Sequence, residues 1–386
     1  MKILTVDVGT GTQDIYLYDS RVDLENGFKL VAPSPTMQIY RRLAAATRRG
    51  QAVMLSGVTM GGGPSQWAAE AHLRAGLPVY ATPDAARSFN DDLDAVARMG
   101  IKVLGEDEAQ RLPASVLRLE LRDFDFAAIR QAFASVDVSL DKLDAVAVAV
   151  FDHGNAPPEV SDRQFRFDYL DARIHSLNRL SAFAYRAGDV PAAMTRLQAV
   201  VKSAQGLDAP LVVMDTAPAA ILGAAFDRQV MARERVMVAN VGNFHTLAFR
   251  LGPGEPWSRP VEAVFEHHTG LVDADKLETL LYKLADGSLR HETVFEDHGH
   301  GALVYASTPL AFGQGDFDVV AVGPRRSLLS QAKGLRTYFP APFGDMMLAG
   351  CFGLLAATAH LLPSLAEEVR SSLLGRVGAA PWEIEA

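Results

Sequence analysis

The sequence predicts an α/β protein of two related lobes, because strand and helix patterns alternate along most of its 386 residues. An apolar strand at 2–7 runs into a polar, glycine-rich hairpin and a second strand at 13–19. The same form, in which an apolar strand, a polar residue, a glycine and a threonine precede a second strand, recurs at 234–251. A chain of this length also suits two domains or two large lobes. We therefore expect lobes at 1–230 and 231–386, with a ligand cleft between them.

The first lobe is expected to hold a central buried strand and a helical insertion. The stretch 143–155 reads as an uninterrupted apolar strand, which indicates that both of its faces are buried. Residues 156–205 are charged and helical in pattern with no obvious strand, so we expect an inserted helical segment there. The other elements expected up to this point are strands at 27–32 and 51–57, a helix at 36–49, a helix that Gly76 ends, a strand–helix–strand unit at 77–105, and a strand then helix at 116–136.

Strand and helix signals continue through the rest of the chain. A strand then helix is expected at 209–227, and a strand leading into a helix at 317–329. The segment 343–362 is rich in small residues and is expected to be a buried helix. Cys351 lies in this helix, and we expect it to be a packing residue.

Composition excludes several classes of protein. A net charge of −9 without a basic block argues against nucleic acid as the main partner. No apolar run approaches membrane-spanning length, and the N-terminus enters a strand directly, so we expect no membrane association and no signal peptide. The single cysteine excludes a disulfide framework and a cysteine-held iron–sulfur cluster. A reducing cytoplasm is the simplest compartment.

The opening hairpin has the composition of an anion cradle. Asp7 ends the first strand, and Gly9 and Gly11 permit positive φ and expose backbone N–H groups. Thr10 and Thr12 add hydroxyl donors. Such a concavity suits an anion, and the carboxylate suits a hard cation that accompanies it. A glycine-rich hairpin with a capping aspartate is the alternative, and the hairpin alone does not decide between them.

Four segments share this arrangement, in which the carboxyl end of a strand leads into a polar or glycine turn. They are 6–14, 212–224, 238–246 and 319–326, and a small-residue helix at 345–361 follows them. In this order they resemble the phosphate-one, first connecting, phosphate-two, adenosine and second connecting motifs of the actin, Hsp70 and sugar-kinase superfamily. The resemblance implies a two-lobed actin-like ATPase (ribonuclease H-like) fold, here with a helical insertion, that binds ATP and Mg²⁺ between its lobes.

The resemblance also implies roles for individual residues. Asp7 would bind Mg²⁺ through water, and Asp215 would be the second carboxylate near the metal and the attacking group. Such carboxylates, a divalent cation and donors around the phosphate oxygens are what phosphoryl transfer requires. The implied nucleotide-binding residues are Gly9, Thr10, Gly11, Thr12, Asn240, Gly242, Asn243, Thr246, Gly323 and Arg325.

Two positions depart from the superfamily pattern. The second phosphate motif usually begins with aspartate, but this chain has Asn240, so the metal would rely on Asp7 and Asp215. The adenosine motif usually has a glycine pair, but Pro324 and Arg325 follow the single glycine here. Arg325 could contact ribose or phosphate, or be a solvated residue at a helix start.

At finer grain, the stretches VTMGGGP, EHHTG and DHGHG resemble a family labelled "pyruvate formate-lyase activating enzyme-like". Such activating enzymes hold an iron–sulfur cluster with three clustered cysteines. This chain has one cysteine in all, so the label does not describe its chemistry.

A second group of residues is expected to form the substrate half of the cleft. Gly61, Gly62 and Gly63 lead into a helix and could hold a phosphate or carboxylate, or simply make a tight connection. Asp152 follows the buried strand and is a candidate catalytic base or a helix cap. The remaining candidates are Glu266, His267, His268, His298 and His300.

Histidines beside carboxylates in loops are also the ligand set for zinc, iron or manganese, although their spacing fits no standard zinc signature. His267 and His268 are adjacent on an expected strand, so their side chains should point to opposite faces and only one can face the cleft. We expect substrate binding or acid–base work at these histidines rather than a dedicated metal.

The function that these observations favour is Mg-ATP binding, with γ-phosphoryl transfer to a small polar or anionic substrate or with ATP hydrolysis. One alternative is a metal-dependent enzyme that uses the histidine loops without ATP. The other is a non-catalytic, nucleotide-gated accessory or assembly factor, which the asparagine at 240 supports. A homo-oligomer is compatible with either.

Overall fold

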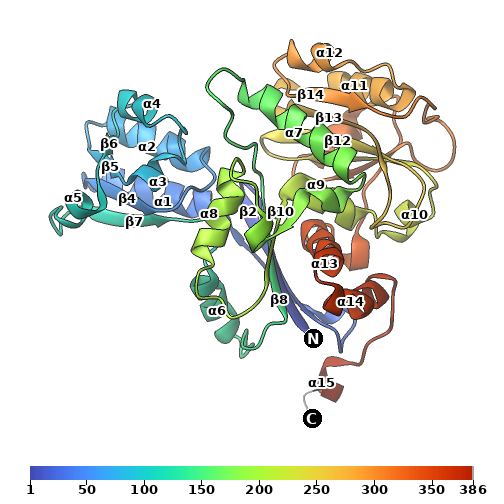
Figure 1. The fold of residues 1–386 in the computed structure, drawn as a ribbon, viewed down its shortest axis with the longest axis horizontal. Helices are drawn as coiled ribbons and strands as arrows, with labels where there is room; N and C mark the ends of the chain where they lie inside the picture. The colour runs from blue at the N-terminus through green and yellow to red at the C-terminus, as the bar shows by residue number, and fades with distance from the viewer. Residues whose placement is uncertain (385–386) are drawn as a thin grey trace.

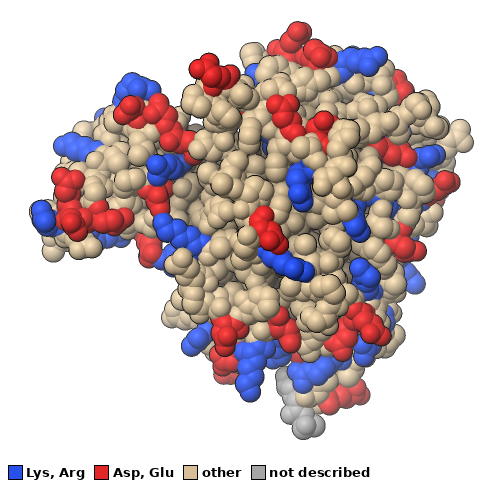
Figure 2. Space-filling view, viewed as in Figure 1, with Lys and Arg blue, Asp and Glu red and all other residues tan. Residues whose placement is uncertain are grey.

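A computed structural model describes residues 1–384 and contains three β-sheets (Figure 1). Two six-stranded sheets have the orders β3-β2-β1-β8-β10-β9 and β14-β13-β12-β11-β15-β16, and a four-stranded sheet has the order β6-β5-β4-β7. Acidic and basic side chains are interspersed over the face seen in Figure 2.

The first sheet begins as an antiparallel meander and continues with parallel strands. β1 (Lys2–Val8), β2 (Thr12–Asp19) and β3 (Phe28–Pro33) pair antiparallel, and β8 (Ala145–Val150) and β10 (Leu211–Asp215) run parallel to β1. β8 is buried at every position. Its alanines face one hydrophobic cluster and its valines face another, because successive side chains of a strand point to opposite faces. Helices α6 (Phe126–Ala134) and α8 (Thr195–Ser203) cover the valine face.

The second large sheet repeats this topology. β11 (Val236–Val241) and β12 (His245–Leu251) form a hairpin as β1 and β2 do, and β13 (Val261–His268) extends it antiparallel. β15 (Val319–Val322) is parallel to β11, and β16 (Thr337–Tyr338) is parallel to β15. β14 (Gly301–Val304) adds an edge, and α11 (Ala274–Asp286) covers the outer face. The two lobes expected from the repeated hairpin are therefore present.

A separate unit is inserted between β3 and β8, and the sequence analysis did not distinguish it from the first lobe. The parallel strands β4 (Val53–Gly57), β5 (Val79–Ala81), β6 (Lys102–Val103) and β7 (Leu117–Leu121) form their own sheet. It stands to the left in Figure 1 and has its own hydrophobic cluster. Its helices are α1 (Pro35–Arg48), α2 (Pro64–Arg74), α3 (Pro83–Ala86), α4 (Leu93–Arg98) and α5 (Glu106–Gln110).

The insertion expected at 156–205 contains α7 (Asp162–Ser176) and α8, together with a short strand that the pattern did not reveal. This strand, β9 (Ala184–Arg186), pairs antiparallel with β10 at the edge of the first sheet. α7 lies against the second lobe, where Arg163 donates hydrogen bonds to the carbonyl oxygens of Phe295 (2.8 Å) and Gly299 (2.5 Å). The insertion thus connects both lobes.

Two apolar helices, α9 (Thr216–Ala224) and α13 (Ala349–Leu361), lie in the core that both large sheets share. α13 also contacts β1 and β8, so a helix from the second half of the chain packs on the first sheet. The lobe limits 1–230 and 231–386 remain a proposal for this reason. The other helices are α10 (Arg228–Met231), α12 (His291–Phe295), α14 (Ala366–Leu373) and α15 (Pro381–Ile384).

α9 and α13 approach each other at glycines. A Cβ atom built on Gly353 would lie 1.9 Å from the carbonyl oxygen of Ala219, and one on Gly223 would lie 1.7 Å from that of Ala349. Both neighbours are backbone atoms that cannot move alone. We expect Gly353→Ala to lower the free energy of unfolding by about 1–3 kcal/mol or more, as overpacking of a core does. Denaturant unfolding measures this change. Gly188→Ala is the control, because nothing lies within 4 Å of that Cβ position; equal stability of both variants would contradict the prediction.

Within residues 1–384 no single helix is long and apolar enough to cross a membrane. The helical segments Ala349–Leu361 and Pro363–Leu373 have the length and apolar composition of a membrane-spanning segment only when they are taken together as a bent pair.

Candidate functional site

A cavity of about 440 Å³ lies where turns of the two large sheets meet the inserted unit. The turns of the β1–β2 and β11–β12 hairpins line it, as do the loop before α2 and the start of α13. The sequence-predicted residues among its lining are Asp7, Gly9, Thr10, Gly11, Thr12, Gly61, Gly62, Gly63, Asp152, Asn240, Gly242, Asn243 and Gly323.

The β1–β2 turn is closed by its own backbone and tied to the start of α1. The amide of Gly9 donates a hydrogen bond to the carbonyl oxygen of Thr12 (2.9 Å). Ser34, the N-cap of α1, donates through its hydroxyl to the carbonyl oxygen of Thr10 (2.5 Å) and through its amide to that of Gly11 (3.1 Å). The turn is therefore held rigidly at the edge of the cavity.

The β11–β12 turn has the same closure. The amide of Gly242 donates to the carbonyl oxygen of His245 (2.9 Å), and a Cβ at this glycine would lie 2.7 Å from that oxygen. Gly323 follows β15 with φ +95°, and a Cβ there would lie 2.5 Å from Oδ1 of Asn240. Only glycine fits this close approach in a left-handed conformation. Thr246 and Arg325 lie outside the cavity lining, and Thr246 is buried with its hydroxyl 2.9 Å from that of Thr269.

Two carboxylates face each other at the base of the first hairpin. Asp7 and Asp14 are directly paired across the β1–β2 ladder, so their side chains lie on one face, and both line the cavity. Oδ1 of Asp7 accepts a hydrogen bond from the hydroxyl of Thr216 (2.5 Å), whereas Oδ1 of Asp14 is buried with no hydrogen-bond partner in residues 1–384. Burial raises the pKa of Asp7 to about 6, and burial together with the neighbouring Asp7 raises the pKa of Asp14 to about 8. Two under-compensated carboxylates fit a divalent cation.

Asp14 was not among the residues predicted from sequence. The signal that could have revealed it is the hairpin register, because a tight turn centred on Thr10 and Gly11 places residue 14 opposite residue 7. Cross-strand partners share a face, so an acidic residue at both positions indicates a carboxylate pair.

Asp215 does not line the cavity. A buried arginine holds its side chain instead. Arg166 of α7 is completely buried and forms ion pairs with Asp215, at the end of β10, and with Glu266 of β13. The Arg166 Nε atom is 3.1 Å from Oε2 of Glu266, and Nη1 also donates to the carbonyl oxygen of Asp152 (2.9 Å). Oδ1 of Asp215 accepts from the amide of Ala217 (3.2 Å) and caps α9. We therefore do not propose Asp215 as a metal ligand or as the group that orients the nucleophile.

Burial acts to raise the pKa of Glu266, but the Arg166 guanidinium holds this pKa well below its usual range. Arg166, Asp215 and Glu266 come from the insertion, the first sheet and the second sheet. The three charges therefore join both lobes at a buried point.

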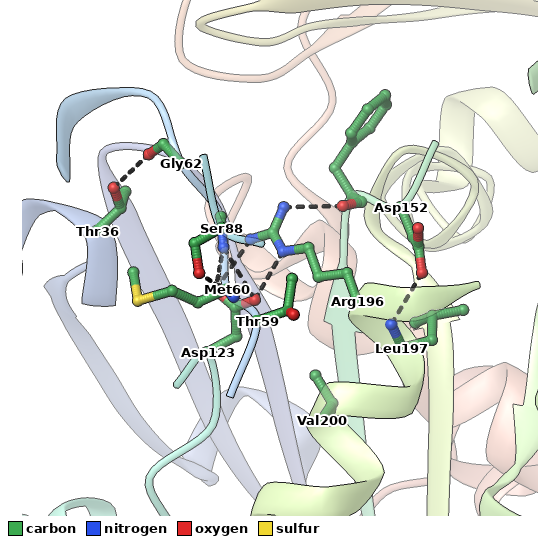
Figure 3. A network of polar contacts seen from close by, with 12 residues as sticks. Thr36, Thr59, Met60, Gly62, Ser88, Asp123, Asp152, Arg196, Leu197 and Val200 are labelled. Carbon is green, nitrogen blue, oxygen red and sulfur yellow. Dashed lines mark hydrogen bonds and ion pairs between the residues drawn. The ribbon is translucent and has the colours of Figure 1, made fainter. Parts of the chain in front are cut away.

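The loop with Gly61, Gly62 and Gly63 is fixed by polar contacts from several elements (Figure 3). The Gly61 amide donates to the carboxylate of Asp123 (3.3 and 3.2 Å), and the Arg196 guanidinium donates to the same carboxylate (2.6 and 3.0 Å). The Gly61 amide is therefore already engaged. All three glycines have close neighbours, because added Cβ atoms would lie 2.5 Å from Arg196, 2.6 Å from the Ser88 carbonyl and 2.6 Å from the Phe244 ring. Packing against these neighbours accounts for three successive glycines, as the alternative of a tight connection expects.

Asp152 also has a structural set of partners. Its Oδ1 accepts from the amide of Gly154 and its Oδ2 from the amide of Leu197, each at 2.8 Å (the latter is drawn in Figure 3). Both oxygens are occupied and the residue is buried. The cap interpretation therefore fits Asp152 better than the role of a catalytic base.

The histidine candidates divide into two groups. His268 and His300 lie with His245 in a cluster whose ring centroids are 4.7–5.1 Å apart, next to Glu266. Burial lowers the pKa of His268 to about 4 and that of His300 to about 3, so both rings are neutral at pH 7. Of this cluster only His245 lines the cavity.

His267 and His298 lie outside this cluster. His267 is buried on the opposite face of β13, with Nε2 3.3 Å from Oδ2 of Asp297. His298 is exposed in a left-handed conformation. The alternation of faces along β13 places His267 away from its neighbour His268, as the sequence predicted.

The repeated sheet topology, with α9 and α13 between the sheets, defines a two-lobed actin-like ATPase fold, which is ribonuclease H-like in each lobe. The chain belongs to the family described as "Putative pyruvate format-lyase activating enzyme (DUF1786)", whose model matches residues 60–328. No curated protein matches the chain.

Solved structures of low similarity have been found. The ethanolamine utilization protein EutJ from Carboxydothermus hydrogenoformans is 12% identical, with 92% of this chain and 89% of that chain covered and a TM-score of 0.34. The ROK hexokinase from Thermus thermophilus is 11% identical, with 66% of this chain and 47% of that chain covered and a TM-score of 0.23. A propionate kinase from Francisella tularensis is 8% identical, with 68% and 56% covered and a TM-score of 0.23. Likenesses at these scores carry no argument about function.

Proposed function

We propose that the cavity binds Mg-ATP and that the protein transfers the γ-phosphoryl group to a small polar substrate or to water. The observation that carries this proposal is the pair of glycine hairpins facing each other, with Asp7 and Asp14 at the base of one. The two turns are close, since Nδ2 of Asn243 lies 3.3 Å from the Cβ position of Gly11. Facing backbone turns are suited to polyphosphate oxygens.

The residues present fit the proposed ligand in chemistry and arrangement. Asp7 and Asp14 would hold Mg²⁺, which prefers carboxylate and water oxygens. When bound, the cation neutralises charge on the phosphates. Gly323 and Met346 also line the cavity and would contact the nucleoside. The implied phosphate ligands are Thr10, Gly11, Thr12 and Asn243, whereas the amides of Gly9 and Gly242 close their own turns and leave room for the close approach.

The substrate would bind at the side of the cavity that the inserted unit forms. Arg87 and Gln66 line this side together with the Gly61–Gly63 loop. A cationic group and an amide favour a small anionic or polar molecule. Arg196 of α8 holds this loop in place through Asp123.

One observation supports a second candidate function, in which the protein binds nucleotide without rapid turnover. Both carboxylates expected to orient an attacking group, Asp152 and Asp215, have their oxygens engaged elsewhere. Asn240 takes the place of a third acidic group. A nucleotide-gated accessory factor would need the binding residues and not a catalytic base.

The activity suggested by the family description is not part of this proposal. The only cysteine of the sequence, Cys351, is buried in α13, with Sγ 3.2 Å from the carbonyl oxygen of Asp14. One buried thiol cannot supply the three clustered thiolates of an iron–sulfur activating enzyme.

Thermal denaturation with nucleotides tests the proposal. We expect ATP with Mg²⁺ to raise the melting temperature, with about 2.7 kcal/mol of added stability at 100 times the dissociation constant. ATP with a chelator should give a smaller shift, because the two carboxylates would then repel the phosphates. If millimolar nucleotide gives no shift with or without Mg²⁺, the cavity does not bind nucleotide. Release of phosphate or ADP then separates turnover from binding alone.

A further inference from the structure

We propose that His245, His268 and His300 form a binding site for a divalent transition metal of the zinc class. One ring nitrogen from each histidine can be chosen so that all three lie within 4.8 Å of one another. This site is separate from the proposed Mg²⁺ site, and it can bind metal whether or not the cavity binds nucleotide.

The second sheet brings the three histidines together through its backbone pairing. His245 begins β12 and is paired directly with His268, which ends β13. The amide of His300, just before β14, donates to the carbonyl oxygen of Glu266 (2.9 Å). Two strands and the residue before a third thus present one histidine each at the same end of the sheet, which holds the ligands on or beside rigid elements.

The ring nitrogens that face Glu266 lie close to its carboxylate but are poorly aligned for hydrogen bonds. Nδ1 of His245 is 3.0 Å from Oε1 of Glu266, and Nδ1 of His300 is 3.6 Å from the same oxygen. None of these three buried atoms makes a well-formed hydrogen bond within residues 1–384. Glu266 is fully buried and His300 is 4% exposed. Buried polar groups in native proteins almost always have partners, so this arrangement requires an explanation.

A metal bound by the other ring nitrogens would orient His245 and His300 so that both Nδ1 atoms face Glu266. Histidine ligands usually donate their other ring N–H to a carboxylate, which orients the ring and makes the ligand nitrogen more basic. Glu266 is in the position of such a carboxylate for both His245 and His300. Arg166 fixes the other oxygen of Glu266 at 3.1 Å, so the carboxylate is itself held in place.

The donor set selects the class of metal. Three neutral imidazoles suit zinc and its neighbours in the transition series, whereas Mg²⁺ and Ca²⁺ require oxygen ligands. Zinc–nitrogen bonds of about 2.0–2.1 Å need donors closer together than 4.8 Å, so the rings would turn inward by roughly 1 Å. Three protein ligands leave a fourth position for water or a substrate oxygen. His245 lines the cavity, so one of the three ligands is at the cavity wall.

Metal binding can be measured directly. The protein would be purified without a histidine tag, stripped with a chelator and titrated with Zn²⁺ in a calorimeter, and Co²⁺ would be added as a spectroscopic probe. We expect one equivalent of tightly bound Zn²⁺, and a visible Co²⁺ spectrum typical of nitrogen ligation. Absence of stoichiometric binding by the parent protein would overturn the proposal.

Variants assign the site to these residues. His268→Ala should weaken Zn²⁺ binding by more than about 100-fold, because even changes beyond the ligands cost roughly 10–100-fold. His298→Ala is the matched control, since this exposed histidine is in the same loop as His300 but outside the cluster. Equal weakening by both variants, or none by His268→Ala, would contradict the assignment. His268 is only partly buried, so its replacement should leave the fold intact, which circular dichroism checks.

The nucleotide experiment separates this proposal from the function proposed above. His268→Ala should keep the melting-temperature shift with Mg-ATP and lose Zn²⁺ binding. If the parent protein binds Zn²⁺ but nucleotide does not change its melting temperature, the nucleotide proposal is wrong and the metal proposal is supported.

Discussion

Arg166→Leu should lower the free energy of unfolding by about 3–5 kcal/mol, the loss typical when one partner of a buried ion pair is removed. Arg166 is completely buried and is the cation for two carboxylates, Asp215 and Glu266, which are themselves buried. Without it, both carboxylates would have to take up protons or remain as uncompensated charges in the core. Chemical denaturation followed by circular dichroism measures the change.

The size of the effect depends on burial rather than on the loss of an arginine. Arg98→Leu is the matched control, because Arg98 is largely exposed and pairs with Asp92 at the surface, where an ion pair contributes about 0–1 kcal/mol. Combining Arg166→Leu with Asp215→Asn and Glu266→Gln should recover much of the lost stability, since no buried charge is then left alone. A change of less than 1 kcal/mol in Arg166→Leu would show that the triad is not a buried ionic contact.

Asp7→Asn should weaken Mg²⁺-dependent ATP binding by on the order of 10²-fold, which is the scale of losing one preorganised electrostatic contact. Asp7 lines the cavity at the root of the first hairpin, opposite Asp14. The same substitution should stabilise the protein without ligand, because burial disfavours the ionised form of the Asp7 carboxylate. Weaker Mg²⁺-dependent ATP binding together with a higher stability of the protein without ligand is the distinctive result.

A calorimetric titration of ATP with and without Mg²⁺ gives the first quantity, and thermal denaturation without ligand gives the second. Asp14→Asn should behave in the same way. Asp19→Asn is the control, since Asp19 is at the far end of β2 and pairs with Arg21. Parental Mg²⁺-dependent affinity in both Asp7→Asn and Asp14→Asn would show that the cation binds elsewhere.

Several features could be read from the sequence because they depend on local pattern. The β1–β2 and β11–β12 hairpins are each determined by a few neighbouring residues, and so is the buried strand at 145–150. The order of these segments predicts the two-lobed fold, because each short motif has one place in that topology. The opposite orientation of His267 and His268 follows from the period of a strand, which needs no tertiary information.

Other features were decided by contacts between residues far apart in the chain. Asp215 looks like a site residue in sequence, but α7 brings Arg166 onto it from 49 positions away, and the ion pair takes the carboxylate out of the cavity. The glycines at 61–63 look like an anion cradle, yet Arg196 and Phe244 explain them by packing.

The same physical reason accounts for what sequence reasoning missed. Asp14 can be recognised as a candidate site residue only when its pairing with Asp7 across the β1–β2 ladder is known. The histidine cluster exists only because β12, β13 and β14 are adjacent and bring together residues 245, 268 and 300. Local pattern thus determined the strands, the turns and the class of fold, because the interactions involved span a few residues. Tertiary structure decided which polar groups face the cavity, because burial and charge pairing depend on neighbours that lie far away in sequence.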